Sequence, residues 1–188
     1  MTSVVPKGFS TWVEVGDQSS KLEGASRPGH FDGVSTVVMR LLGAVQPDVL
    51  WLGQKDAQQA IVIERMCADL LSPVTVRRGA TSREDDGLAR SSRNAYLSAA
   101  ERQQAVALSQ GLAAARSLLA AGETSAAKLV AAIRREWAGY PLVQEDYVAV
   151  VDAATLQAVR QVRARVLLAV AARVGPARLI DNMEWGKR

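Results

Sequence analysis

The chain has 188 residues, of which 48% are hydrophobic and 22% charged, and its formal net charge at pH 7 is +4. This length allows one ordinary domain, or one small domain plus part of another, and the composition is typical of a folded globular protein. The most apolar run, 166–174, is interrupted by Arg173 and is far shorter than a bilayer span. Residues 1–16 lack the apolar core of a signal peptide. We therefore expect a cytoplasmic protein.

Cysteine and histidine occur once each, as Cys67 and His30. One cysteine cannot form an intramolecular disulfide, and a single cysteine with a single histidine argues against a structural zinc site. Cys67 lies among apolar residues of a predicted helix, so we expect a small buried thiol. The positive charge is spread along the chain without a basic block, so nucleic-acid binding has only the sequence pI of 9.6 in its favour. An anionic small-molecule substrate explains the charge equally well.

The first eighty residues read as alternating helices and strands. They are a β-like stretch at 10–15, a turn-rich segment at 22–33, a helix at 34–45, a strand at 48–52, a turn at 53–55, a helix from the N-cap Asp56 to about Leu71, and a strand at 74–77. This order is typical of a parallel α/β sheet. Such sheets usually carry five or six strands with helices on both faces. About three strands would leave apolar faces exposed, and we expect further strands upstream.

Beyond residue 80 the pattern changes to an α+β arrangement. It comprises a helix opened by the capping-box pair Ser98 and Glu101 and running to about Ala121, a helix from Thr124 or Ser125 to about Trp137, a strand at 146–151, a helical turn at 153–159, and strands at 165–173 and 177–180. The three strands are expected to form an antiparallel sheet.

Three polar segments lie where predicted loops meet helices or strands, at 27–31, 53–59 and 83–94. The second follows a predicted parallel strand, the edge at which open α/β sheets bind ligands. There Gly53 would let the backbone approach a ligand, Lys55 would neutralise phosphate charge, and Gln59 would present an amide. In the third segment, Ser91-Ser92-Arg93 combines hydroxyl and guanidinium donors that suit a polyphosphate.

Each segment also has a purely structural alternative. His30 would serve as a satisfied structural histidine, Lys55-Asp56 as a solvated turn with a cap, and Ser91-Ser92 as ordinary loop. No Walker loop, GxGxxG motif or nucleophilic triad is present in the sequence. The residues alone therefore favour only an α/β protein that binds an anionic small molecule.

The same segments resemble the pantothenate synthetase family. Residues 22–34 are similar to its LEG..RPGHF.GV motif, 45–59 to its VQPD....GEKD.QQ motif, and 83–98 to its RE.DGLA.SSRN.YLS motif. The stretches 147–152 and 178–182 resemble the end of the family sequence. The resemblance covers nearly the whole chain from about Gly8, and its motifs are highly specific when taken together.

This resemblance implies a fold and a reaction. Family members condense pantoate with β-alanine at the expense of ATP and Mg²⁺, and release AMP and pyrophosphate after forming a pantoyl-adenylate. The resemblance implies a partial Rossmann-like nucleotidyltransferase domain at 1–81 that binds ATP and pantoate. A small α+β lid domain would occupy 82–188, and the protein would be a homodimer.

The resemblance also implies roles for individual residues. It gives a catalytic role to Lys55, Ser91, Ser92 and Arg93. It makes Gln59 the pantoate contact. The implied ATP-binding residues are Gly53, Gln54, Lys55, Asp56, Ser82, Arg90, Ser91, Ser92 and Arg93.

The sequence departs from the family pattern by one missing segment and at three single positions. The family's MG.LH.GH segment, whose histidines hold the ATP phosphates, has no counterpart in this sequence. Gln54 replaces the usual Glu, Arg90 an apolar residue, and Ser82 a valine. We therefore expect the C-terminal two-thirds of a family member. The alternatives are a non-catalytic remnant, or a half that works with a separate N-terminal segment.

Overall fold

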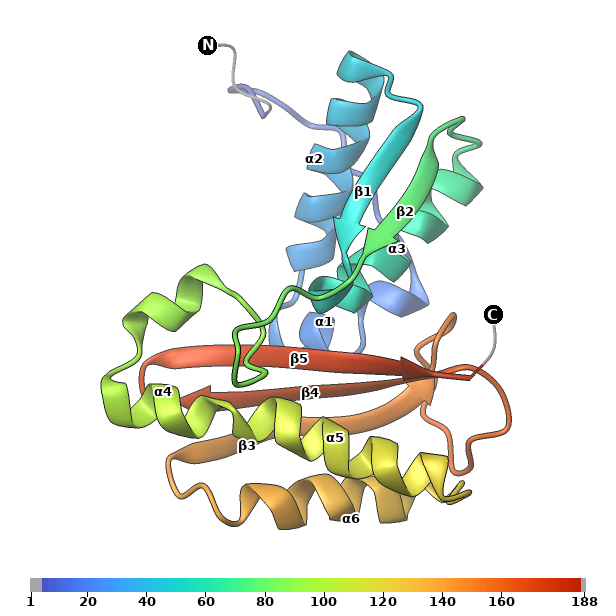
Figure 1. The fold of residues 1–188 in the computed structure, drawn as a ribbon. Coiled ribbons are helices and arrows are strands. Elements are labelled where there is room, and N and C mark those ends of the chain that lie inside the picture. Colours follow the sequence, from blue (N-terminus) through green and yellow to red (C-terminus); the bar gives the residue numbers. More distant parts are fainter. Residues whose placement is uncertain (1–4, 187–188) are drawn as a thin grey trace. The chain divides into compact units, whose positions relative to one another are not determined.

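The computed structural model describes residues 5–186, which divide between Ala80 and Thr81 into two compact units (Figure 1). Unit 1 ends at Ala80 and unit 2 begins at Thr81. A two-stranded parallel sheet lies in the first and a three-stranded antiparallel sheet in the second. The predicted order, a parallel α/β part followed by an α+β part, is thereby confirmed. No helix in the described part of the chain is long and apolar enough to cross a membrane.

Unit 1 is built from two long helices and two strands. Its elements are η1 (Asp17–Ser19), α1 (Glu23–Ser26), α2 (His30–Val45), β1 (Val49–Gly53), η2 (Gln54–Asp56), α3 (Ala57–Asp69) and β2 (Thr75–Gly79). The parallel register sets Val49 opposite Thr75 and Gly53 opposite Gly79. The carboxyl ends of both strands therefore lie at the same edge of the sheet.

One face of this sheet is packed and the other is not. Leu50, Leu52 and Val76 pack against the buried cluster that α2 and α3 supply, including Phe31 and Ile63. Because side chains alternate along a strand, the neighbouring residues point the opposite way. There Val49 is 40% and Trp51 65% exposed. On this face β1 thus presents two apolar side chains to solvent, beside the exposed Thr75 and Arg77 of β2.

Two predictions for unit 1 need correction. No strand forms at 10–15, because the Val13 amide donates to the Thr36 side chain of α2 instead of to a neighbouring strand. The helix predicted from residue 34 starts at His30, immediately after Gly29, which takes the left-handed conformation with φ of 74°. Its end at Val45 agrees with the prediction, and Pro47 follows it closely.

Unit 2 packs helices against its sheet (Figure 1). Its elements are η3 (Ser92–Tyr96), α4 (Ala99–Ala105), α5 (Ala107–Ala120), α6 (Ala126–Trp137), β3 (Val143–Asp152), β4 (Val166–Val174) and β5 (Ala177–Trp185). The sheet order is β3-β4-β5, so β4 is the central strand. Alternate β4 residues from Val166 to Val174 join the buried cluster that also contains Leu108, Leu112 and Ile133.

The close approach of α5 and α6 depends on Gly111. A Cβ atom added there would lie 2.7 Å from Nε1 of Trp137 and 2.9 Å from Cγ2 of Ile133. The Trp137 indole fills this space and donates a hydrogen bond of 2.8 Å to the Ala107 carbonyl. Glycine at this position therefore lets one helix seat a tryptophan against the other.

The predictions for unit 2 are confirmed in their main elements and wrong in two details. The capping box is present, since Ser98 Oγ accepts from the Glu101 amide and the Glu101 carboxylate accepts from the Ser98 amide. The long helix that it opens is divided at Val106 into α4 and α5. The helical turn predicted at 153–159 is shorter than expected. The Leu156 amide donates to the Asp152 carbonyl at 3.0 Å, but Leu156 takes the left-handed conformation, with φ of 57°, and the turn ends there.

Candidate functional site

In unit 1, the predicted ligand-binding edge is the place where β1 ends. Gly53 is the last residue of β1, Gln54 to Asp56 form η2, and α3 begins at Ala57. Asp56 is the N-cap residue of α3, as predicted, but its side chain makes no capping hydrogen bond. The first turn of a helix that lacks a side-chain cap has amide donors to offer an anion.

Lys55 carries positive charge at this edge. Its side chain is 17% exposed, and its Nζ lies 3.5 Å from Oδ1 of Asp56, whose side chain is 53% exposed. The ammonium group is thus largely sheltered while its carboxylate neighbour is open to solvent. A cation beside the beginning of a helix favours the binding of an anionic group such as a phosphate.

The two glutamines of this segment differ in their surroundings. Gln58 is 5% exposed and uses its whole amide group: Oε1 accepts from the Glu23 amide at 3.0 Å, and Nε2 donates to the carbonyls of Gln18 and Lys21 at 2.8 and 2.7 Å. Gln58 therefore holds the 18–23 segment in place. Gln59, the residue predicted to bind pantoate, is half-buried in the first turn of α3.

His30 is the first residue of α2, and its Nε2 lies 3.0 Å from Nη1 of Arg27. Its ring also lies beside Phe31, with 5.1 Å between the ring centroids. The ring thus has protein partners within the RPGHF segment, as the structural alternative for this histidine requires.

In unit 2, residues 82–90 form a hairpin, which we call the 82–90 hairpin. Arg83 and Ala89 form an antiparallel bridge, and the Arg90 amide donates to the Ser82 carbonyl at 2.9 Å. Gly87 allows the tip to turn, with φ of 91°. Ser82 and Arg90, both predicted to contact ATP, are therefore held side by side by their backbones.

The Ser91-Ser92-Arg93 segment follows directly. Ser91 is the N-cap of η3, and its Oγ accepts from the Arg93 amide at 3.2 Å. The Asn94 amide closes the turn by donating to the Ser91 carbonyl at 3.1 Å. Ser92 and Arg93 are exposed and Ser91 is half-buried. One tight turn thus offers two hydroxyls and a guanidinium.

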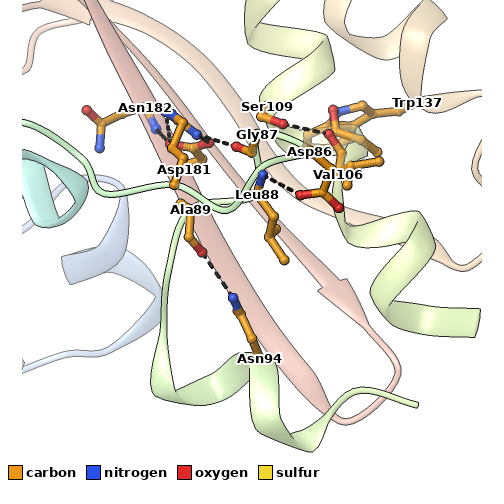
Figure 2. Close-up of polar contacts among 12 residues, drawn as sticks. Asp86, Gly87, Leu88, Ala89, Asn94, Val106, Ser109, Trp137, Asp181 and Asn182 are labelled. Atoms are coloured by element: carbon orange, nitrogen blue, oxygen red, sulfur yellow. Dashed lines mark hydrogen bonds and ion pairs between the residues drawn. The ribbon is translucent and has the colours of Figure 1, made fainter. Parts of the chain in front are cut away.

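Sequence reasoning missed the ion pair that anchors the hairpin. Arg83 donates from Nη1 to Oδ2 of Asp181 at 2.6 Å and from Nη2 to Oδ1 at 3.0 Å. Asp181 lies on β5 with its side chain only 2% exposed (Figure 2). Arg83 Nη1 also donates to the Gly87 carbonyl at the hairpin tip. The pair joins residues 98 positions apart, so no local pattern in the sequence could have revealed it.

A second set of charges ties the hairpin to α4. Arg102 donates to Oε2 of Glu84 and to Oδ2 of Asp86, both at 2.7 Å. These hydrogen bonds lower the pKa values of the Glu84 and Asp86 carboxyls below their ordinary range. They also raise the pKa of Arg102. Glu84 and Asp86 belong to a segment that the sequence singled out, but nothing in the pattern pointed to Arg102 as their partner.

The candidate residues thus form two groups, 53–59 in unit 1 and 82–93 in unit 2. The fold and these groups define an α/β protein that presents a lysine and an uncapped helix at the carboxyl end of a parallel strand, with a serine- and arginine-bearing turn in its second unit. The family model for pantoate-beta-alanine ligase matches residues 1–184, and the chain belongs to this family.

Individual relatives agree with that assignment. The pantothenate synthetase of Heliobacterium modesticaldum is 51% identical over 178 residues, which cover 95% of this chain and 63% of the relative. The crystal structure of pantothenate synthetase from Thermus thermophilus matches with a TM-score of 0.93 and 43% identity, over 98% of this chain and 67% of that one. Pantoate-beta-alanine ligase from Francisella tularensis, solved with β-γ ATP and β-alanine, matches with a TM-score of 0.68, 27% identity and coverage of 96% and 60%. This chain therefore spans less than two thirds of the Heliobacterium protein's length.

Proposed function

We propose that this chain provides the ATP- and pantoate-binding residues of a pantothenate synthetase. The reaction would condense pantoate with β-alanine through a pantoyl-adenylate and release AMP and pyrophosphate. The observation that carries the proposal is Lys55, sheltered beside the uncapped start of α3 at the carboxyl end of β1, in a member of this family. The Francisella relative, solved with an ATP compound and β-alanine, supports the choice of ligands.

The residues of unit 1 would bind the two molecules that react first. Gly53 has no side chain, which leaves room for ATP along the end of β1, and the first amides of α3 would donate to its phosphates. Gln54, Lys55 and Asp56 would line this contact, with Lys55 neutralising phosphate charge. Gln59 would hydrogen-bond pantoate, since Gln58 is fully engaged with the protein backbone.

The residues of unit 2 would act on the leaving group. Attack of the pantoate carboxylate on the α-phosphorus breaks the bond to the β-phosphate oxygen, and negative charge moves onto pyrophosphate. Donors fixed in advance stabilise such charge better than mobile ones do. Ser91, Ser92 and Arg93 would supply these donors, and Ser82 and Arg90 would contact the nucleotide through the paired backbone of the hairpin.

Magnesium would accompany ATP. The described residues contain no group of three or more His, Cys, Asp and Glu side chains arranged to hold a metal ion. Magnesium in nucleotide enzymes is coordinated largely by substrate phosphates and water. We propose that it enters as the magnesium complex of ATP. From the family resemblance we also propose a cytoplasmic homodimer with 82–188 acting as a lid.

A second candidate is that this polypeptide works only with a separate segment bearing the family's histidines, or is an inactive remnant. The exposed face of β1 favours a partner, because Val49 is 40% and Trp51 65% exposed on a sheet whose opposite face is packed. Association that covered this face would remove apolar surface from water.

The test is AMP release by the purified chain supplied with ATP, magnesium, pantoate and β-alanine. Release that depends on both pantoate and β-alanine supports the first candidate. Absence of release, followed by recovery when the N-terminal third of the Heliobacterium relative is added, supports the partner-dependent form. Absence of release under both conditions would support the alternative that this polypeptide is an inactive remnant.

Lys55→Ala supplies the residue-level test, in whichever condition gives AMP. Loss of the phosphate-neutralising charge should reduce the rate to background. Lys128→Ala is the matched control, because Lys128 is 70% exposed, is paired with Glu123 and belongs to neither candidate group, 53–59 or 82–93. An unchanged rate for Lys55→Ala would remove Lys55 from the mechanism.

A further inference from the structure

We propose that Asn94 is a positioning residue that clasps the two ends of the 90–93 segment, and that Arg102 sets its position through Glu84. The inference deepens the proposed function, since it explains how the donors offered to the phosphates of ATP are held. It rests on contacts within unit 2 alone.

The clasp is a pair of hydrogen bonds from one amide group. Nδ2 of Asn94 donates to the Ala89 carbonyl at 3.1 Å (Figure 2) and to Oε1 of Glu84 at 3.2 Å. Ala89 immediately precedes the 90–93 segment and Asn94 immediately follows it. The side chain therefore ties the end of the segment to its beginning, and both amide hydrogens are used.

The orientation of this amide is fixed by charge. Glu84 is a carboxylate and can only accept a hydrogen bond, so reversing the Asn94 amide would bring two acceptors together. Oδ1 of Asn94 is buried and has no hydrogen-bond partner among the described residues. An orphan acceptor costs stability and offsets part of what the two donated bonds contribute. We therefore expect Asn94 to matter more for the local shape of the segment than for global stability.

Glu84 is itself held from the opposite side. Its Oε2 accepts from Arg102 at 2.7 Å, while Oε1 accepts from Asn94. Arg102 also binds Asp86, whose Oδ1 accepts from the Leu88 amide at 3.2 Å (Figure 2). Arg102 lies on α4, in the first turns after the Ser98 capping box. A regular helix thus fixes Glu84, and Glu84 fixes the clasp.

Within the segment, the side chains of Arg90 and Ser91 make local hydrogen bonds, whereas those of Ser92 and Arg93 are exposed. Arg90 is fixed through its amide to Ser82 and through Nε to the Arg83 carbonyl. The neighbours hold the backbone in place; of the side chains that would meet phosphate, Ser92 and Arg93 are exposed and Ser91 is half-buried.

The experiment compares Asn94→Ala with Gln103→Ala in the full 188-residue chain. Gln103 is an exposed residue on α4, so its truncation controls for loss of an amide side chain. Three quantities are measured: hydrogen exchange of the amides at 90–94 without ligand, the dissociation constant for ATP by calorimetry, and the melting temperature. We expect Asn94→Ala to speed exchange at 90–94 and to weaken ATP binding by about tenfold, the loss that one typical hydrogen bond accounts for. The melting temperature and the exchange of β4 and β5 should stay near those of Gln103→Ala.

The outcomes separate this inference from the proposed function. Unchanged exchange at 90–94, or faster exchange spread equally over all of unit 2, would overturn the clasp. Faster local exchange in a chain that binds no ATP, variant or not, would support the clasp and count against the nucleotide site. Should Asn94→Ala fail to fold, Glu84→Gln is the second test: its amide would face Arg102 or Asn94 with a donor, and the same local loosening is expected. If the amides at 90–94 exchange as slowly in Glu84→Gln as in the unmodified chain, the proposal that Arg102 acts through Glu84 is contradicted.

Discussion

The two units solve the same problem, that of fixing an irregular segment beside a sheet, with different chemistry. In unit 1 the neutral amide of Gln58 makes three hydrogen bonds to the backbone of 18–23. In unit 2 the 82–90 hairpin is fixed by charges, through Arg83 to Asp181 and through Arg102 to Glu84 and Asp86. The packing differs too, since alternate β4 residues are fully buried while β1 leaves Trp51 exposed.

This comparison predicts the cost of removing each kind of contact, the neutral hydrogen bonds of Gln58 and the ion pairs of Arg83 and Arg102. A neutral amide that is removed leaves unpaired backbone groups, whose cost is moderate. A charge that is removed leaves its buried partner as an uncompensated ion, whose cost is larger. The strength of an ion pair also depends on pH, whereas that of an amide hydrogen bond does not. The hairpin is therefore expected to be both more firmly held and more sensitive to conditions than the 18–23 segment.

The largest effect is expected for Arg83→Ala. This change leaves the carboxylate of Asp181, 2% exposed, without its bidentate partner. We expect a loss of about 3 kcal/mol in the free energy of unfolding, near the lower end for a broken buried pair because the Arg83 side chain is 33% exposed. Urea unfolding measures the loss, and hydrogen exchange of β5 assigns it to unit 2.

Two further variants sharpen that result. Arg116→Ala removes an exposed arginine of α5 and should change stability little. Replacing both Arg83 and Asp181 by Leu should cost less than Arg83→Ala alone, because no unpaired charge is left behind. Equal losses for the single and double variants would show that the buried charge is not what makes the hairpin anchor strong.

A smaller effect is expected in unit 1 for Gln58→Ala. The change leaves the Glu23 amide and the Gln18 and Lys21 carbonyls without their partner, and we expect a loss of about 2 kcal/mol. Faster hydrogen exchange at 18–26 would locate it. Gln59→Ala is the matched control on the next residue: it should keep the stability and weaken only the proposed binding of pantoate. Equal destabilisation by both variants would contradict the division of roles between the two glutamines.

Local patterns were enough to predict the elements that frame the candidate site. The strand, turn and helix around Lys55 follow from an apolar run, a glycine and an N-cap residue, and the structure has β1, η2 and α3 there. The Ser98 capping box was predictable because its two partners lie three residues apart. The two candidate groups, 53–59 and 82–93, came from motifs that are likewise continuous in the sequence.

The failures have two physical causes: hydrogen-bond partners that are distant in sequence, and the local conformation of a turn residue. The 10–15 stretch has the alternation of a strand, but its Val13 amide bonds to the Thr36 hydroxyl of a helix. The 153–159 stretch has helical composition and Asp152 caps its first amides, but Leu156 takes the left-handed conformation, with φ of 57°, and ends the turn. Asp181 and Arg102 were not found because their partners lie 98 and 18 residues away.

The smallest expected effect is the loss of stability at low pH, which tests the ion pairs of Arg102 with Glu84 and Asp86 in unit 2. Arg102 lowers the pKa values of Glu84 and Asp86 below their ordinary 4.5 and 3.8, so these carboxylates bind protons less readily in the folded protein than in the unfolded one. Their contribution to stability is therefore complete above those ordinary values and disappears as the pH falls through the lowered ones. We expect the urea concentration at the unfolding midpoint of unit 2 to decrease as the pH is lowered through that range. In the double variant Glu84→Gln, Asp86→Asn the midpoint should be lower at neutral pH and should decrease less on acidification. Hydrogen exchange at 84–88 should follow the same pH course, while exchange at 18–26, held by the neutral Gln58, should show no such step. An acid profile identical in the double variant and the unmodified chain would mean that Arg102 holds the hairpin by geometry and not by charge.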